Sequence, residues 1–299
     1  MRNIDWFKMK TVSIRHLPEL QEDIEKFQRL DLLDKHLAEV YLKFDFDVAT
    51  AFPGVQSLLV IAIPQPVTRA SFSWLNKVYS ADIPPTYIGK VDDARVKNIL
   101  TTMLRPTGFK LVRMRLPVKT LAVRSGLAQY GRNNITYVPG FGSYHRLIAF
   151  ATDAPCEEDN WGELKTMKAC NSCFKCEENC PTSCIPKDRF LLHAENCLTW
   201  YTEREDMFAS WIKPEWHNAL IGCMQCQLVC PVNKNQLAKI IPRAIFSEED
   251  TALLLQKPPL NTLPDETRQK LSEIAMDDYY EVLARNLAVL IKSQDLKYK

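Results

Sequence analysis

Ten cysteines carry the clearest chemistry of this sequence, and all of them lie between Cys156 and Cys230. The first group has the spacing Cys-x2-Cys-x2-Cys-x3-Cys-Pro and consists of Cys170, Cys173, Cys176 and Cys180. This spacing is typical of bacterial ferredoxins, in which the first three thiolates bind one [4Fe–4S] cluster and the fourth binds another cluster. The pattern therefore predicts a second group of ligands further along the chain.

That second group has the spacing Cys-x2-Cys-x3-Cys-Pro and consists of Cys223, Cys226 and Cys230. If the two groups exchange ligands as ferredoxins do, cluster one binds Cys170, Cys173, Cys176 and Cys230. Cluster two then binds Cys180, Cys223, Cys226 and one further thiolate, for which the spacing leaves Cys184 and Cys197 as candidates. Cys156 is left over, and we expect it to be a small buried side chain rather than a ligand.

A structural zinc site is the alternative, because two Cys-x2-Cys pairs also occur in zinc ribbons. A tetrahedral zinc ion takes four ligands and does not require two sets of four cysteines, each run ending in Cys-Pro. The iron–sulfur interpretation is therefore favoured. Residues 1–5 contain no export signal and the longest apolar run is too short to span a bilayer. We therefore expect a cytoplasmic protein that does not associate with a membrane. In the reducing cytoplasm, clustered cysteines bind metals rather than form disulfides.

A pair of clusters conducts electrons, so the long segment before Cys170 is expected to bind the group that takes or gives them. This segment contains no P-loop and no G-x-G-x-x-G after a strand, which argues against ATP and a Rossmann-bound nicotinamide. The composition, with 46% hydrophobic and 25% charged residues, is that of a soluble globular protein. The net charge of +2 predicts no overall preference for nucleic acid.

The elements that must position this chemistry alternate between helix and strand. Hydrophobic periodicity predicts helices over residues 19–44, 94–104 and 118–127, and two short helices within residues 265–293. A buried strand is expected at 55–63, and further strands at 110–116, 135–138 and 144–151. A Pro139-Gly140 turn separates the last two. This alternation favours an α/β sandwich.

At this point the sequence resembles the epoxyqueuosine reductase family and, more distantly, the corrinoid-dependent reductive dehalogenases. The resemblance rests on the two cysteine runs with the single Cys197 in the gap between them. It extends to residues 52–60 (FPGVQSLLV), 124–134 (RSGLAQYGRNN), 142–144 (GSY) and 284–290 (ARNLAVL). By the family pattern, Cys197 rather than Cys184 completes cluster two.

The resemblance implies a cobalamin held base-off by an α/β domain with a nitroreductase-like core, reduced through both clusters. The implied domains are residues 1–155 for corrinoid and substrate, 156–240 for a ferredoxin-like double [4Fe–4S] module, and 241–299 for a helical tail. Two glycine-containing stretches would line the corrinoid, because glycine permits close approach of the backbone. They are Gly131, Arg132, Asn133 and Asn134, and Gly140, Phe141, Gly142 and Ser143.

The sequence departs from the family at the proton donor, which is an aspartate ahead of the helix in epoxyqueuosine reductases. Residues 112–117 contain no carboxylate, and a leaving epoxide oxygen needs a proton. Arg146 occupies the place of an arginine with which dehalogenases hold a leaving anion, and Tyr130, Tyr144 and His145 are the candidate acids. The alternative roles are a solvated or paired arginine and core tyrosines with hydrogen-bonded hydroxyls.

The expected partners are a low-potential electron donor such as ferredoxin or flavodoxin, and a small-molecule or modified-nucleoside substrate. The basic residues Lys234, Lys239 and Arg243 could dock an acidic donor, although such a group is often simply solvated. The chain ends where tRNA-acting family members continue into a helical-repeat domain, which weakens the expectation of a tRNA substrate. The alternative function is an electron-transfer or reductive-activator protein that binds no corrinoid.

Overall fold

The structure is a computed structural model that describes residues 6–297, apart from the side chains of residues 90–92. It contains two compact units, which are described separately. Unit 1 takes in Met1–Gln65, Gly89–Phe174 and Ile185–Ala194, and unit 2 takes in Pro66–Ile88, Lys175–Cys184 and Glu195–Lys299. Both units are discontinuous in sequence, whereas the expected domains were contiguous stretches. The boundaries at residues 155 and 240 stay a prediction.

Unit 1 is built on a four-stranded antiparallel sheet with the order β1-β2-β8-β5. These strands are β1 (Lys8–Ser13), β2 (Ser57–Pro64), β8 (His145–Thr152) and β5 (Leu111–Met114). In β2, the apolar run expected at 55–63, every residue from Ser57 to Ile63 is buried. Leu58 and Val60 pack into one hydrophobic cluster, and Leu59 and Ile61 into another, since side chains alternate across a strand. The sheet is therefore a middle layer.

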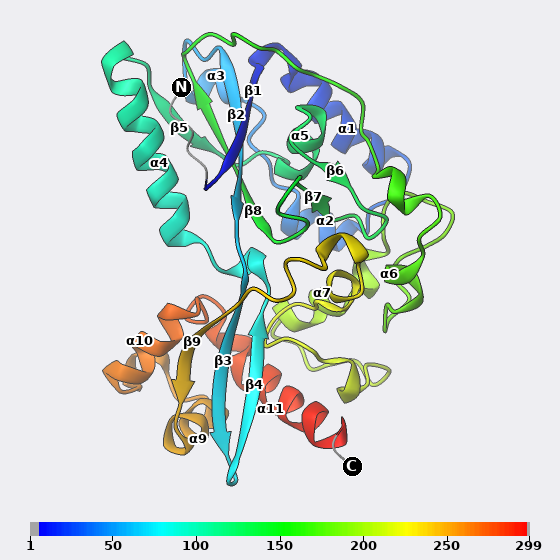
Figure 1. The fold of residues 1–299 in the computed structure, drawn as a ribbon, viewed down its shortest axis with the longest axis vertical. Helices are drawn as coiled ribbons and strands as arrows, with labels where there is room; N and C mark the ends of the chain where they lie inside the picture. Colours follow the sequence, from blue (N-terminus) through cyan, green and yellow to red (C-terminus); the bar gives the residue numbers. More distant parts are fainter. Residues whose placement is uncertain (1–5, 298–299) are drawn as a thin grey trace. The chain divides into compact units, whose positions relative to one another are not determined.

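Helices cover both faces of this sheet (Figure 1). On one face α1 (Leu17–Arg29) and α5 (Val118–Arg124) contribute Leu20 and Leu121 to the core. On the other face α4 (Lys90–Leu104) contributes Val96 and Leu100. The expected α/β sandwich is confirmed, and so are the elements expected at 55–63, 94–104, 110–116, 118–127 and 144–151, with ends shifted by a few residues.

The single helix expected over residues 19–44 is wrong. Helix α1 ends at Arg29, and a separate α2 (Lys35–Tyr41) follows. Asp31 has a left-handed backbone with φ 52°, and the Asp34 carboxylate accepts the Leu37 N–H at 2.8 Å as the cap of α2. Aspartates stabilise helix ends in this way, so the apolar spacing continues across a break in the backbone.

The other elements of unit 1 are short. Helix α3 (Val48–Ala51) precedes β2, and β6 (Gln129–Tyr130) pairs with β7 (Thr136–Tyr137) as a small hairpin. The strand expected at 135–138 is thus reduced to β7. Gly140 has φ +80°, as the turn expected at Pro139-Gly140 requires.

Unit 2 contains a three-stranded sheet with the order β4-β3-β9. The strands β3 (Val67–Trp74) and β4 (Lys77–Ile83) form a hairpin, and β9 (Ile240–Phe246) runs parallel to β3. The rings of Phe72 and Phe246 stack at 4.5 Å within a core shared with three helices. They are α9 (Glu248–Gln256), α10 (Asp265–Glu273) and α11 (Tyr280–Lys297). Two helices are present where the tail was expected to have them, but α11 has 18 residues and is not short. Strands β1, β3, β4 and β9 and helix α9 were not expected.

The cysteines of unit 2 lie around three short helices, α6 (Lys175–Glu178), α7 (Leu198–Glu203) and α8 (Gln225–Leu228). Each helix begins directly after a cysteine or contains one. Among the described residues no helix is long and apolar enough to cross a bilayer.

Candidate functional site

Three cysteine thiols gather in unit 2. The Sγ atoms of Cys180 and Cys184 are 3.5 Å apart, and the Cys184 thiol is also hydrogen-bonded to Cys197. Cys184 is 2% exposed. The two residues that the spacing left open as the fourth ligand of cluster two therefore lie beside each other, at Cys180, which was assigned to the same cluster.

The protonation preferences of these thiols differ. The hydrogen bond from Cys184 is the main reason why the pKa of Cys180 is lowered to about 5, and it also lowers the pKa of Cys197. The same hydrogen bonds, together with burial, raise the pKa of Cys184. Cys184 is therefore a hydrogen-bonding neighbour of both Cys180 and Cys197.

The sulfur of Cys223 accepts a hydrogen bond from a side-chain amide. Asn218 Nδ2 lies 3.2 Å from Cys223 Sγ and 3.0 Å from the Trp216 carbonyl oxygen. Asn218 Oδ1 accepts the Met224 N–H at 2.8 Å. Burial raises the pKa of Cys223 to about 11, and the hydrogen bond from Asn218 acts in the opposite direction.

The first two cysteines of the ferredoxin-like run lie in unit 1, where Arg132 binds their backbone. Arg132 donates from Nη2 to the Cys170 carbonyl at 2.7 Å and from Nε to the Cys173 carbonyl at 3.1 Å. Its guanidinium carbon lies 4.2 Å from the centre of the Phe174 ring. In this structure the side chain of Arg132, expected to line the corrinoid, binds the loop that contains Cys170 and Cys173, which are expected to bind cluster one.

The remaining cysteines lie in or near the short helices of unit 2, apart from Cys156 in unit 1. Helices α6 and α8 pack against each other in unit 2 and contain Cys176 and Cys226, and Cys230 follows α8. None of the ten cysteines is in a disulfide. Cys156 was expected to be buried, but in the loop after β8 it is only half-buried. Within residues 6–297 no group of three or more His, Cys, Asp or Glu side chains is arranged to hold a single metal ion.

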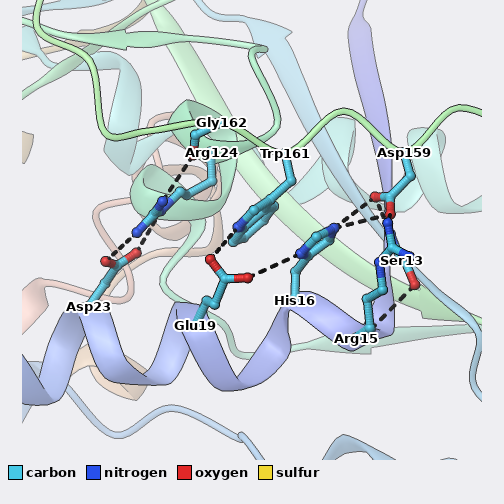
Figure 2. Close-up of polar contacts among 9 residues, drawn as sticks. All are labelled: Ser13, Arg15, His16, Glu19, Asp23, Arg124, Asp159, Trp161 and Gly162. Carbon is cyan, nitrogen blue, oxygen red and sulfur yellow. Dashed lines mark hydrogen bonds and ion pairs between the residues drawn. The ribbon is translucent and has the colours of Figure 1, made fainter.

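The linker from β8 to the first cysteines is tied to α1 and α5 in unit 1 (Figure 2). Nε2 of His16 lies 3.1 Å from both carboxylate oxygens of Asp159, and the His16 ring stacks on Trp161 at 4.5 Å. Arg124 donates to the Gly162 carbonyl at 3.0 Å. Trp161 and its neighbours are thereby held a few residues before Cys170.

The two stretches expected to line the corrinoid form turns at the ends of β7 in unit 1. Gly131 packs so closely that an added Cβ would lie 2.5 Å from the Tyr137 ring, and Asn133 donates from Nδ2 to the Tyr137 hydroxyl at 3.1 Å. Asn134 is left-handed, with φ 57°. Its Nδ2 is buried and has no hydrogen-bond partner among the described residues.

The predicted acids are all buried, in different surroundings. The Tyr130 hydroxyl lies 3.1 Å from Thr120 Oγ1, and burial raises the pKa of Tyr130 to about 12. Tyr144, which immediately precedes β8, is 2% exposed. His145 Nδ1 donates to the Gly142 carbonyl at 3.1 Å, so the neutral ring accepts the Thr136 hydroxyl proton at Nε2, 3.0 Å away.

A pH dependence follows from His145, because burial lowers its pKa to about 4 from an ordinary 6.5. Between these values the unfolded chain binds a proton that the folded chain does not, so stability falls as the pH decreases. At pH 5 the loss attributable to this histidine is about 2 kcal/mol. We expect the melting temperature of His145→Gln to fall less steeply than that of the wild type between pH 7 and pH 5. Anaerobic thermal melts measure this, and equal changes of melting temperature with pH in the two proteins would contradict it. The pKa of His217 is also lowered to about 4, but this histidine is present in both proteins and does not affect the difference between them.

Arg146 makes a bidentate ion pair with Asp93. The sequence motifs did not identify Asp93 as a partner of this arginine. Its Nε and Nη2 lie 2.7 and 2.9 Å from the two Asp93 carboxylate oxygens. Arg113 Nη2 lies 2.8 Å from the same carboxylate. Asp93 is 5% exposed in the first turn of α4. Because side chains alternate along β8, Arg146 lies on the α4 face of the sheet with Asp93, whereas His145 contacts Thr136 and Gly142 on the opposite face. The structure therefore does not bring all four predicted catalytic side chains together.

Comparison with known proteins agrees with the chemistry of the cysteines. Residues 169–233 match the family described as 4Fe-4S double cluster binding domain. A segment of 157 residues is 28% identical to the epoxyqueuosine reductase of Bacillus subtilis strain 168 and covers 52% of this chain and 39% of that protein. This chain is a relative of the epoxyqueuosine reductases. The expected resemblance is confirmed, and residues 169–233 are an iron–sulfur rather than a zinc domain.

The fold is shared with solved epoxyqueuosine reductases. The structure from Streptococcus thermophilus superposes with a TM-score of 0.66 and 18% identity, over 96% of this chain and 77% of that chain. A crystal structure with an epoxyqueuosine-modified tRNA-Tyr stem loop gives a TM-score of 0.65 and 21% identity, with the same coverage. The sequence match with the Bacillus subtilis epoxyqueuosine reductase spans well under half of its length.

Proposed function

We propose that this chain is a corrinoid-dependent iron–sulfur reductase of the epoxyqueuosine reductase type. Electrons from a protein donor would reach a substrate through two [4Fe–4S] clusters and a base-off cobalamin. The observation that carries the proposal is the pair of cysteine runs inside the double-cluster domain, on a fold shared with epoxyqueuosine reductases.

The donor set of unit 2 fits cluster two. All four thiols expected to bind it belong to this unit, namely Cys180, Cys197, Cys223 and Cys226. Cys180 and Cys197 share Cys184 as a hydrogen-bonding neighbour, so their thiols lie close together. Thiolates are the ligands that such clusters require.

Unit 1 offers polar groups that fit a corrinoid. Asn134 Nδ2 and Gln65 Oε1 are buried without a hydrogen-bond partner among the described residues. Buried polar atoms are normally satisfied, and the amide side chains around a corrin ring contain both acceptors and donors. When bound, cobalamin would supply a strongly reducing cobalt. The backbone at residues 131–134 and 140–143 would line it.

We assign the substrate-facing roles to residues at the start of β8. Arg146 would bind an anionic group or a leaving oxygen, since Asp93 holds its guanidinium in a fixed orientation. The family's carboxylate is absent from residues 112–117, so Tyr144 is our first candidate for the proton donor and Tyr130 the second. His145, neutral above about pH 4, would position Thr136 and the adjacent turn.

The substrate class that we propose is a modified nucleoside or a small molecule of similar chemistry. One epoxyqueuosine reductase has been crystallised with a modified tRNA stem loop, whereas the net charge of +2 gives this chain no overall preference for nucleic acid. A ferredoxin or flavodoxin would serve as the electron donor. The exposed Lys234, Lys239 and Arg243 in unit 2 would dock its acidic surface.

Anaerobic purification followed by iron, sulfide and cobalt analysis tests this proposal. We expect about eight iron and eight sulfide per chain, as two [4Fe–4S] clusters require. We also expect tight uptake of added cobalamin, with the absorption spectrum of the base-off form. Iron-free protein, or protein that contains zinc alone, would contradict the proposal.

The second candidate is an electron-transfer or activator protein without a corrinoid. The missing carboxylate at residues 112–117 favours it, because a protein that only passes electrons needs no proton donor at a substrate. The same purification decides between the two functions. Full iron content together with no uptake of cobalamin would support this second function.

A further inference from the structure

Two side chains outside the expected ligand set make hydrogen bonds with sulfurs that are expected to bind cluster two. One donor is the amide of Asn218 at the sulfur of Cys223. The other is the thiol of Cys184, which is hydrogen-bonded to Cys180 and to Cys197 and acts as the donor where those two are thiolates. All five residues belong to unit 2, and neither donor belongs to either cysteine run.

The orientation of the Asn218 amide is fixed by its other partners. Its oxygen accepts the Met224 N–H, so the nitrogen must be the atom that faces Cys223. One N–H donates to the Trp216 carbonyl, and the second is directed at Cys223 Sγ at 3.2 Å. Exchanging the amide atoms would place two acceptors against each other at Trp216. The side chain therefore presents a donor to the sulfur.

Cys184 lies where an S–H can reach the sulfurs of both Cys180 and Cys197. It is 2% exposed, its Sγ lies 3.5 Å from that of Cys180, and it is also hydrogen-bonded to Cys197. A neutral S–H in this position can donate to one thiolate at a time. If Cys180 and Cys197 both bind the cluster, the proton of Cys184 is directed at a ligand sulfur in either orientation.

We propose that Asn218 and Cys184 raise the reduction potential of cluster two by donating hydrogen bonds to its ligand sulfurs. Reduction adds one negative charge to the cluster, and a donor at sulfur stabilises the more negative state more strongly. The inference rests on the proposed function, because it requires cluster two to be bound. Cluster two would then hold an electron at potentials at which it would otherwise be oxidised.

A redox titration of the anaerobic protein, followed by electron paramagnetic resonance, tests the amide. Asn218→Asp keeps an acceptor for the Met224 N–H but removes the donor at Cys223, and Asn218→Ala removes both. We expect both variants to keep their iron and to shift the reduction equilibrium of one cluster at least tenfold toward the oxidised form. A tenfold shift corresponds to about 59 mV for one electron. The other cluster should not change.

Cys184→Ala and Cys184→Ser test the thiol in the same titration. The alanine variant loses the donor and should shift the same cluster in the same direction. The serine variant retains an O–H donor, so its shift should be smaller. Cys156→Ala is the matched control for loss of a thiol, and Asn179→Asp is the control for added charge, since Asn179 is exposed and donates to the Lys175 carbonyl. Both controls should leave the potentials unchanged.

The outcomes separate the inference from the proposed function. Wild-type protein without iron would overturn both. Full iron content with unchanged potentials in Asn218→Asp and Cys184→Ala would overturn only the donor role. Loss of about half the iron in Cys184→Ala would show that Cys184 is a ligand. This result would also overturn the donor role of Cys184.

Discussion

Replacement of Cys197 by serine is expected to reduce the bound iron from about eight to about four atoms per chain. Cys197 is the expected fourth ligand of cluster two, and its thiolate is favoured by the hydrogen bond from Cys184. A serine hydroxyl does not ionise at neutral pH and is a weak ligand for iron, so cluster two should be lost. Cluster one, which is expected to use other thiolates, should remain. Iron and sulfide analysis of the anaerobic protein measures the loss.

Matched cysteine variants make this result specific. Cys173→Ser should also lose about half of the iron, but from cluster one, so that the two variants retain different paramagnetic signals after reduction. Cys156→Ser should keep the full complement, because Cys156 belongs to neither run. Full iron content in Cys197→Ser would contradict the ligand assignment. So would a loss of half the iron in Cys184→Ser with none in Cys197→Ser.

Spacing predicts the two cysteine runs as ligands because a loop that wraps an iron–sulfur cube uses cysteines separated by two or three residues; this assignment stays a prediction. Spacing could not decide between Cys184 and Cys197, since both follow the first run at a distance. Nor could it reveal Asn218 or Asp93. Asn218 reaches Cys223 through a turn that no motif describes, and Asp93 meets Arg146 across more than fifty residues of sequence.

The strands that could be predicted are likewise those with a clear local sequence pattern. Strand β2 was predictable because burial on both faces leaves a continuous apolar run. The β3–β4 hairpin was missed because its turn places Leu75 and Asn76 in the left-handed region, at φ 50° and 60°, without the glycine that usually marks such a turn. Strand β9 contains Pro242 and pairs with β3 from a distant part of the sequence, so its residues give little local signal.

Removal of the Asp93 carboxylate has the second large expected effect. Asp93→Ala should lower the free energy of unfolding by about 2–3 kcal/mol, because two guanidinium groups would remain side by side without their common partner. The value lies below that of a fully buried pair because Arg113 is half-exposed, at 51%, and Arg146 is 24% exposed. Denaturant unfolding of the anaerobic protein, compared with the wild type, measures it.

A double-mutant cycle separates this ion pair from simple loss of packing. Arg113→Ala should cost less than about 1 kcal/mol, since an exposed partner contributes little. The double variant Asp93→Ala/Arg146→Ala should be more stable than the sum of the two single losses predicts, because the second change removes the unpaired charge. If the losses simply add, the ion pair contributes nothing specific. Arg146 would then be held by its packing against Gly89, where an added Cβ would collide with its side chain. The carboxylate would in that case have no part in orienting the proposed anion-binding group.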